Sequence, residues 1–200
     1  MPRPRRFDEI ALLDGALEIF WSRGFERTSI EDVATATGVG NGSIYAAYGS
    51  KLGLFLAVFR RYCAGRAELV ERVIHDHQGD FAAAVENFLE AIVVDCTSHG
   101  DGRGCLMLNS LGELSARYPA VAEVGRETLE RMNAVLEARV RAGIDAGEIA
   151  LESGDAAGLG AHLVLVSQGL INLSRIGVPA GQLRSIAAAS SRMSHLLSAA

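Results

Sequence analysis

Two short amphipathic segments, separated by a glycine turn, restrict what this chain can fold into more than any other feature. The segments cover about 29–37 and 42–48, and the turn between them begins with Gly38-Val39-Gly40. Two short helices joined by a glycine-containing turn form a helix-turn-helix, which presents its second helix to DNA. We therefore predict a helix-turn-helix over about 29–48.

The first of these segments carries the signals of a short helix. Ser29 followed by Asp32 is a variant of the capping box, and an acidic first turn suits the positive end of the helix dipole. Ile30 and Val33 fall on its inner face, and Gly38 ends it.

The second segment has one apolar face and one face free to meet a partner. Asn41 is a good N-cap residue. Ile44 and Tyr48 are four residues apart and should share the buried face, whereas Tyr45 lies about 100° away and should point outward.

A glycine-rich loop before a helix can also hold a phosphate group, so this alternative needs a test. The sequence has no strand before the loop, no G-x-x-x-x-G-K-[ST], and serine rather than a third glycine at position 43. The nucleotide-binding motifs require these features. The helix-turn-helix is therefore the better interpretation.

The rest of the chain has the period of helices and no hairpin signal, which predicts an all-α protein of about nine helices. Further helices are expected over 7–23, 51–77, 80–97, 105–118, from Pro119 onward, 155–177 and 180–198. The first should bury one face formed by Ile10, Leu13, Leu17, Phe20 and Trp21.

Composition and charge narrow the class of protein. Apolar residues make up 49% and charged residues 22%, as in globular domains. Residues 1–61 carry 8 basic and 7 acidic side chains, whereas the rest carries 11 and 17. Three basic residues, Arg3, Arg5 and Arg6, form an N-terminal arm that suits either contact with nucleic acid or a tail without a partner.

The sequence also indicates the compartment in which the protein works. Three scattered cysteines form no disulfide framework, which indicates a reducing compartment. We expect no secretory signal, because the N-terminus lacks an apolar core, and no membrane-spanning stretch.

Four ordered motifs in the first fifty residues carry a family resemblance. They are F-x-x-x-G-F (20–25), T-S-I-E-D-V-A (28–34), G-V-x-x-G-S-I-Y (38–45) and Y-G-S-K (48–51). The chain resembles the TetR/AcrR family of transcriptional regulators over this region, and LVSQGLINLSR (165–175) looks like a dimerisation helix of that family.

The resemblance implies two domains, a homodimer and a near-palindromic operator on double-stranded DNA. Residues 1–50 would bind DNA, and 51–200 would bind a small-molecule effector and dimerise through the helices 155–177 and 180–198, with helix 51–77 as the link. Positions that contact DNA in the family match Thr28, Ser29, Asn41, Gly42, Ser43, Tyr45, Ala46 and Lys51, and the arm Arg3, Arg5 and Arg6 resembles one that some members lay along DNA.

Two departures from the family pattern bear on base recognition. Asn41 stands where many members have lysine, and Ala46 and Ala47 stand where many have larger residues. Asn41 is then the best candidate for a direct base contact, to adenine, and DNA shape would supply the rest.

Four residues of the larger domain are candidates for an effector or sensor site. Cys105 follows a glycine-rich loop at a helix start, which suits a reactive thiolate of a redox-sensing repressor, or plain packing. Asn109 and Glu113 share a helix face that suits a ligand pocket or a surface ion-pair face. His162 lies among apolar residues in the sequence. This position suits a residue of the ligand cavity, a residue of the dimer interface, or a core histidine with its hydrogen bonds formed inside the protein.

No residue pattern indicates catalysis or a cofactor. No catalytic triad, paired carboxylates or H-E-x-x-H can be assembled, and His75 and His77 at i, i+2 do not share a helix face for a metal. The family resemblance implies a cytoplasmic bacterial regulator that is not an enzyme, most simply a ligand-released repressor, with an activator of the same fold as the alternative.

Overall fold

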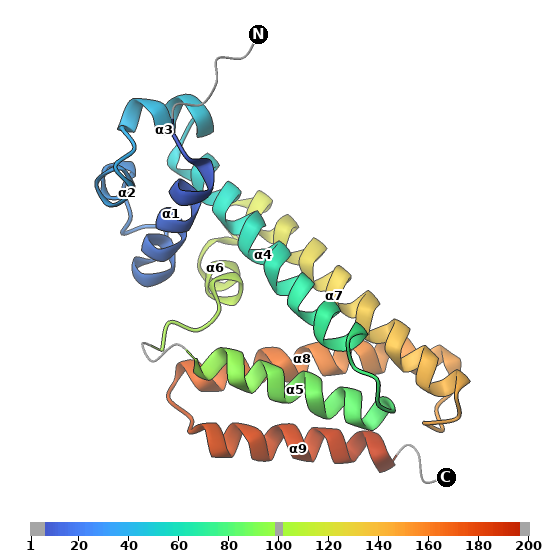
Figure 1. The fold of residues 1–200 in the computed structure, drawn as a ribbon. Helices are drawn as coiled ribbons and strands as arrows, with labels where there is room; N and C mark the ends of the chain where they lie inside the picture. Colours follow the sequence, from blue (N-terminus) through green and yellow to red (C-terminus); the bar gives the residue numbers. More distant parts are fainter. Residues whose placement is uncertain (1–6, 99–101, 197–200) are drawn as a thin grey trace.

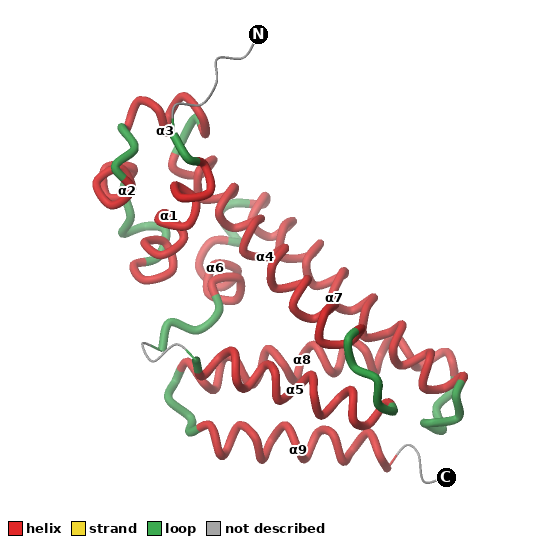
Figure 2. The backbone as a smooth tube through the Cα atoms, viewed as in Figure 1, coloured by secondary structure: helices red, strands yellow, loops and turns green. Residues whose placement is uncertain are grey.

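The computed structural model describes residues 7–98 and 102–196, and every regular element in these ranges is helical (Figures 1 and 2). The predicted all-α fold is confirmed. The arm residues Arg3, Arg5 and Arg6 lie outside the described residues. The helices are α1 (Glu9–Arg23), α2 (Ile30–Thr37), α3 (Asn41–Tyr48), α4 (Lys51–His75), α5 (Phe81–Thr97), α6 (Leu106–Leu114), α7 (Pro119–Asp145), α8 (Ala156–Arg175) and α9 (Ala180–Leu196), with a short 3-10 turn, η1 (Ser153–Asp155).

Helix α1 confirms the predicted face in part, because Phe20 is buried and Leu13, Leu17 and Trp21 are half-buried against the core. Its buried residues are Leu12, Ala16, Ile19 and Phe20, whereas Ile10 is 64% exposed. A Cβ atom on Gly15 would lie 2.5 Å from the methyl group of Thr37 in α2. Small residues thus let α2 approach α1 closely, and a search for large apolar residues misses this face.

Helix α4 connects the two parts of the molecule through a cluster of aromatic rings. Phe55 of α4 lies 5.2 Å from Phe20 and 5.1 Å from Phe25, between ring centroids. Phe25 also meets Tyr118, which precedes α7, at 5.5 Å. Burying a phenylalanine side chain contributes about 1.5–3 kcal/mol, so these rings fix the three helices of the N-terminal part against the rest.

A second set of contacts joins α1 to the segment before α6. The indole Nε1 of Trp21 donates a hydrogen bond to the carbonyl oxygen of Gly104 at 3.0 Å. The guanidinium of Arg103 lies 4.3 Å from the Trp21 ring and forms an ion pair with Glu18 at 2.6 Å. We call this group, Glu18, Trp21, Arg103 and Gly104, the α1 clasp.

The larger part is a bundle in which α7 packs on α4 and α8, and α5 lies between α8 and α9 (Figure 1). A Cβ atom on Gly160 of α8 would lie 2.8 Å from the backbone nitrogen of Glu137 in α7, so this glycine permits the close approach of the two helices. Helix α6 ends at Leu114, earlier than predicted, and a turn leads to Pro119, which begins α7 as expected.

Among the described residues, α8 is long and apolar enough to cross a membrane by length and composition, which does not by itself indicate a membrane span. Core helices of globular proteins pass the same test. Leu163, Leu170 and Ile171 of α8 are buried in the bundle, which accounts for much of its apolar character.

Candidate nucleic-acid interface

Helix α3 presents an exposed face above a firmly buried one. Ile44 is fully buried, and the Tyr48 hydroxyl donates a hydrogen bond to the carboxylate of Glu9 at 3.1 Å. Both predictions for the buried face are confirmed. The exposed residues of the helix are Asn41, Gly42, Ser43, Tyr45 and Ala46.

Tyr45 is the most prominent side chain on this face. It is 52% exposed, as its position in the helix predicted. Because Ile44 and Tyr48 hold α3 in place, the ring of Tyr45 projects from a fixed backbone.

The structure corrects the prediction that Asn41 caps α3. The N-cap is Gly40, in extended conformation, and no side chain caps this helix. Asn41 is the first helical residue, so its amide group is not held by a capping bond and is free to meet a partner.

The start of α2 differs from expectation in how its hydroxyls are used. Thr28 is 2% exposed and donates its hydroxyl to the carbonyl oxygen of Gly24 at 2.8 Å. Contrary to expectation, this side chain is therefore not on the surface that a phosphate can reach.

Ser29 is exposed, and the predicted capping box is present. The Asp32 amide donates to the Ser29 hydroxyl at 3.1 Å, and the Ser29 amide donates to the Asp32 carboxylate at 2.7 Å. Hydrogen bonds from Ser29, and the nearby Arg23, lower the pKa of the Asp32 carboxyl. The hydroxyl of Ser29 is thus already engaged within the helix cap.

Lys51 begins α4 beside the turn after α1. Its ammonium group donates to the carbonyl oxygen of Phe25 at 3.0 Å and lies 4.3 Å from the centroid of the Phe25 ring. The positive charge is held at a fixed place, close to the start of α2.

Cys105 lies at the N-cap of α6 and is 5% exposed. Its sulfur accepts a hydrogen bond from the Tyr62 hydroxyl at 3.4 Å, and that hydroxyl accepts one from the Leu106 amide at 3.3 Å. Burial raises the pKa of Tyr62, so its hydroxyl stays protonated and can donate. Burial also raises the pKa of the Cys63 thiol to about 12, which fits plain packing for that residue.

Sequence reasoning missed a polar group beside Cys105. Arg66 of α4 forms an ion pair with Asp95 of α5 at 2.6 Å, and both line a small cavity of about 30 Å³ together with Tyr62, Cys96 and Cys105. No spacing rule links α4 to α5, so nothing in the sequence could have paired these residues.

The other candidate residues for an effector or sensor site do not all lie together. Asn109 and Glu113 line one cavity beside α1, whereas His162 is exposed on α8. Among the residues that the structure describes, no three metal-ligating side chains gather into a group.

Two protein-family models match the chain in sequence. Residues 12–58 match "Bacterial regulatory proteins, tetR family", and residues 82–189 match "Tetracyclin repressor-like, C-terminal domain". The first range covers the helix-turn-helix and the start of α4, and the second covers most of the remaining bundle.

Individual relatives agree with these models. The chain is 36% identical over 113 residues to the HTH-type transcriptional repressor ComR of Escherichia coli K12, covering 56% of this chain and 54% of ComR. It is 28% identical over 165 residues to the uncharacterized HTH-type transcriptional regulator YezE of Bacillus subtilis 168, covering 82% and 84%. The match thus spans about half the length of ComR.

A solved structure similar to this chain contains DNA. It is a cysteine mutant of the TetR family transcriptional regulator CifR, complexed with a 26 bp double-strand operator. Its TM-score is 0.79 at 28% identity, over 95% of this chain and 98% of that chain.

Proposed function

Since this chain belongs to the TetR family of bacterial regulatory proteins, we propose that it is a transcriptional regulator that binds operator DNA as a homodimer. The observation that carries this proposal is the exposed face of α3, held over the buried Ile44. A helix supported in this way can enter the major groove without losing its packing. We place the protein in the bacterial cytoplasm and propose no catalytic role.

The residues of α3 have different parts in this interface. Asn41 reads a base edge, where an asparagine can form two hydrogen bonds to adenine. Tyr45 reaches a phosphate with its hydroxyl and a thymine methyl group with its ring. Ser43 and Ala46 pack against the DNA backbone and bases, and Lys51 adds positive charge near the phosphates.

The start of α2 contacts phosphate through its backbone. The capping box engages the Ser29 hydroxyl, and Thr28 is buried. The amides of the first helical turn, beginning at Ile30, point toward the helix N-terminus, where anions are stabilised.

Dimerisation uses α8 and α9. Leu165 and Ile176 are 66% and 76% exposed, in or next to α8, and Met193 of α9 is 61% exposed. His162 lies one helical turn before Leu165 on α8 and is also exposed, so we assign it to the interface between subunits. A helix pair from each subunit would form a four-helix contact.

The regulator responds to a small-molecule effector, and it represses in the absence of that effector. Repression rather than activation is favoured by the likeness to ComR, which is described as a repressor. A reporter gene behind the operator distinguishes the two signs, because only a repressor raises the output when its gene is deleted.

The test of the function is a binding titration with the DNA upstream of the protein's own gene. Fluorescence anisotropy would compare this DNA with a scrambled duplex at two salt concentrations. We expect at least ~10³-fold preference for the upstream DNA and steep salt dependence. Equal affinity for both duplexes and for other candidate promoters would contradict an operator-reading protein.

Gly42 offers a test that separates stability from DNA binding. A Cβ atom added there has no atom within 4 Å, so nothing within the described protein requires glycine. Gly42→Ala should raise the free energy of unfolding by about 0.5–1 kcal/mol and lower operator affinity, because the methyl group meets the DNA. Urea unfolding and anisotropy measure the two effects, and Gly65→Ala in α4, which is equally open and lies outside the proposed interfaces, is the control. An unchanged operator affinity would show that α3 does not approach DNA at this residue.

A thiol-based sensor is a second candidate function, because Cys105 shares a small cavity with Cys96 and its sulfur accepts a hydrogen bond from the Tyr62 hydroxyl. We expect a mild oxidant such as hydrogen peroxide to reduce operator affinity and a thiol reductant to restore it. Cys105→Ser should abolish this response, while Cys63→Ser, at the thiol with the raised pKa, should keep it. Anisotropy before and after oxidation checks both variants, and an intact response in Cys105→Ser would remove this candidate.

A further inference from the structure

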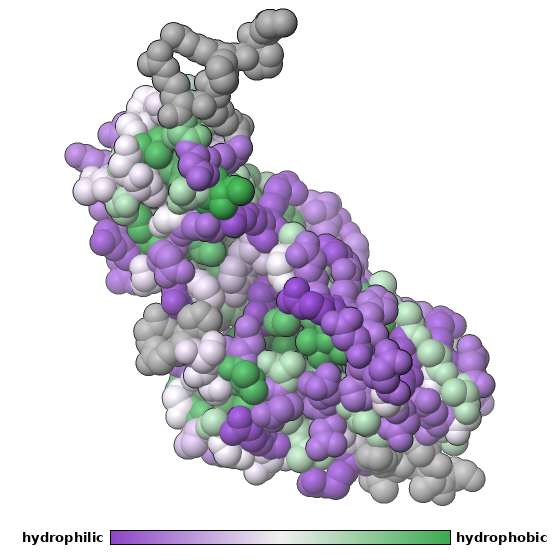
Figure 3. Space-filling view, viewed as in Figure 1, coloured by the Kyte–Doolittle hydropathy of each residue, from purple (hydrophilic) through white to green (hydrophobic). Residues whose placement is uncertain are grey.

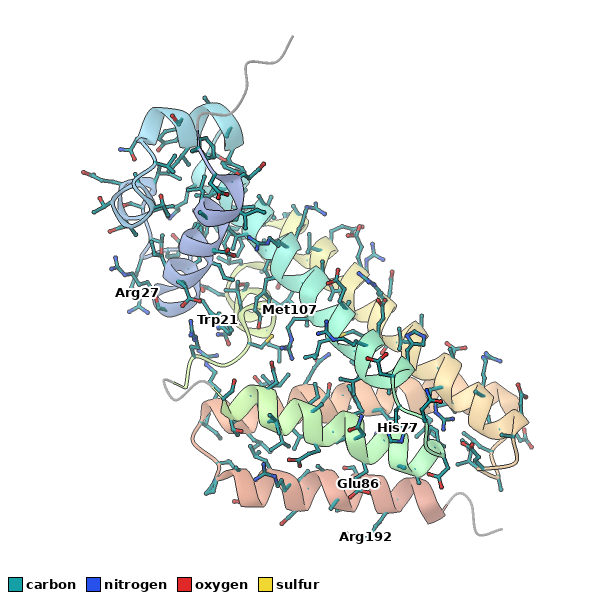
Figure 4. The ribbon with its side chains drawn as sticks, in the orientation of Figure 1. Trp21, Arg27, His77, Glu86, Met107 and Arg192 are labelled. Carbon is teal, nitrogen blue, oxygen red and sulfur yellow. The ribbon has the colours of Figure 1, made fainter. Side chains whose placement is uncertain are left out.

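A cavity of about 330 Å³ lies where the DNA-binding part meets the larger bundle. Figure 4 shows Trp21 and Arg27 at the end of α1 that is next to α6. Side chains from α1, the turn after it, the segment before α6, α6 itself and the end of α8 line the cavity. They include Phe20, Arg23, Arg27, Arg103, Asn109, Glu113 and Arg175.

The lining carries more basic than acidic side chains. Among its described residues are four arginines and one carboxylate, that of Glu113. Arg23 and Arg103 are neutralised by ion pairs with Asp32 and Glu18.

The other two arginines are available to a ligand. Arg27 donates its Nε group to the carbonyl oxygen of Arg23 at 3.0 Å, which leaves the two terminal nitrogens of its guanidinium. Arg175 is exposed and forms no ion pair among the described residues. Planar guanidinium groups bind carboxylates with two parallel hydrogen bonds.

An acceptor group complements these donors. The side-chain amide of Asn109 donates to the carbonyl oxygen of Arg103 at 2.8 Å, which fixes its orientation. Its Oδ1 atom is buried and has no hydrogen-bond partner. A buried acceptor of this kind costs about 1–3 kcal/mol unless a donor reaches it.

Glu113 adds a second acceptor on the same side. A Cβ atom on Gly24 would lie 3.5 Å from its carboxylate, so Glu113 faces the end of α1. It forms no ion pair among the described residues. The cavity therefore offers cationic donors from Arg27 and Arg175, and acceptors from Asn109 and Glu113.

We infer that this cavity binds a small organic anion that also carries a hydroxyl or amino donor. The carboxylate would meet Arg27 and Arg175, and the donor would meet Oδ1 of Asn109. The cavity draws on both regions matched by the family models, so a ligand in it contacts α1 and α6 at once. Only the effect on DNA rests on the proposed function.

Malate and succinate are the probes, because they differ by a single hydroxyl group. Isothermal titration calorimetry without DNA should show malate binding about fivefold to tenfold more tightly than succinate, as expected for one added hydrogen bond. Arg27→Gln and Arg175→Gln should each weaken malate binding at least tenfold. Arg192→Gln, on α9 away from the cavity (Figure 4), should leave it unchanged.

Glu113→Gln tests the sign of the electrostatic effect. Glu113 is exposed, so the fold should tolerate the change, and succinate should bind more tightly because a negative charge has been removed.

Three outcomes would overturn the site: no heat with malate, equal affinity for both acids, or malate binding weakened as much by Arg192→Gln as by the two cavity variants. If malate binds as expected but leaves operator affinity unchanged, the site stands and the proposed coupling to DNA fails.

Discussion

Replacing Tyr45 by alanine should lower the affinity for operator DNA about a thousandfold. One lost contact of this type costs about 1–3 kcal/mol, and a homodimer loses it in both half-sites. Because Tyr45 is 52% exposed and Ile44 beneath it is untouched, the free energy of unfolding should not fall. Anisotropy titration gives the affinity, and thermal unfolding gives the stability.

The control for this substitution is Val94→Ala on α5. Val94 has the same exposed fraction of 52% but lies far along the chain from α3. It should leave operator affinity within a factor of two or so, as expected for a surface change away from the interface. If Tyr45→Ala binds the operator as tightly as Val94→Ala does, α3 is not the recognition helix.

Replacing Leu165 by glutamate should convert the dimer to a monomer and weaken operator binding by about 10²–10⁴-fold. Leu165 is 66% exposed on α8, within the segment that resembles a dimerisation helix. A carboxylate buried in an apolar interface is unpaired and therefore strongly unfavourable. The loss of DNA affinity follows because two half-sites are no longer bound by one particle.

Sedimentation equilibrium measures the mass directly, and anisotropy measures the operator affinity. Ile10→Glu is the control for mass, because Ile10 is 64% exposed but belongs to α1. That variant should remain a dimer. A dimeric Leu165→Glu protein would move the subunit interface away from this part of α8.

The sequence predicted the helix-turn-helix well, because its signals are local. The capping residue Ser29, the glycine at position 38 and the spacing of Ile44 and Tyr48 each act within one turn of helix. Residue type at a fixed offset is enough to predict such features.

The features that the sequence did not predict depend on contacts between segments that are far apart in the sequence. The predicted face of α1 was incomplete, because Gly15 lies against Thr37 of α2 and Ala16 is buried, and such small residues give little hydrophobic signal. Thr28 is buried, and its hydroxyl donates to the carbonyl oxygen of Gly24, a contact that no helical period predicts. The pair of Arg66 and Asp95 joins residues 29 positions apart, which no periodicity relates.

The cavities were predicted only in part. Asn109 and Glu113 were placed correctly on one side of a helix, and the structure adds the arginines that face them. Figure 3 shows polar and charged residues over most of this side of the bundle, with apolar surface only in separate small areas. A hydrophilic surface of this kind does not by itself mark which arginines enclose a cavity.

The α1 clasp and the aromatic contacts of Phe25 have a consequence for protein engineering. A hybrid regulator is commonly imagined as one recognition module fused to any sensing module at the start of α4. Here such a graft would separate Trp21 from Gly104 and Phe25 from Tyr118, two pairs that lie 83 and 93 positions apart. A working chimera would therefore have to exchange α1 together with the segment before α6 and the turn before α7. The part of this protein that must be exchanged as one unit is therefore discontinuous in sequence.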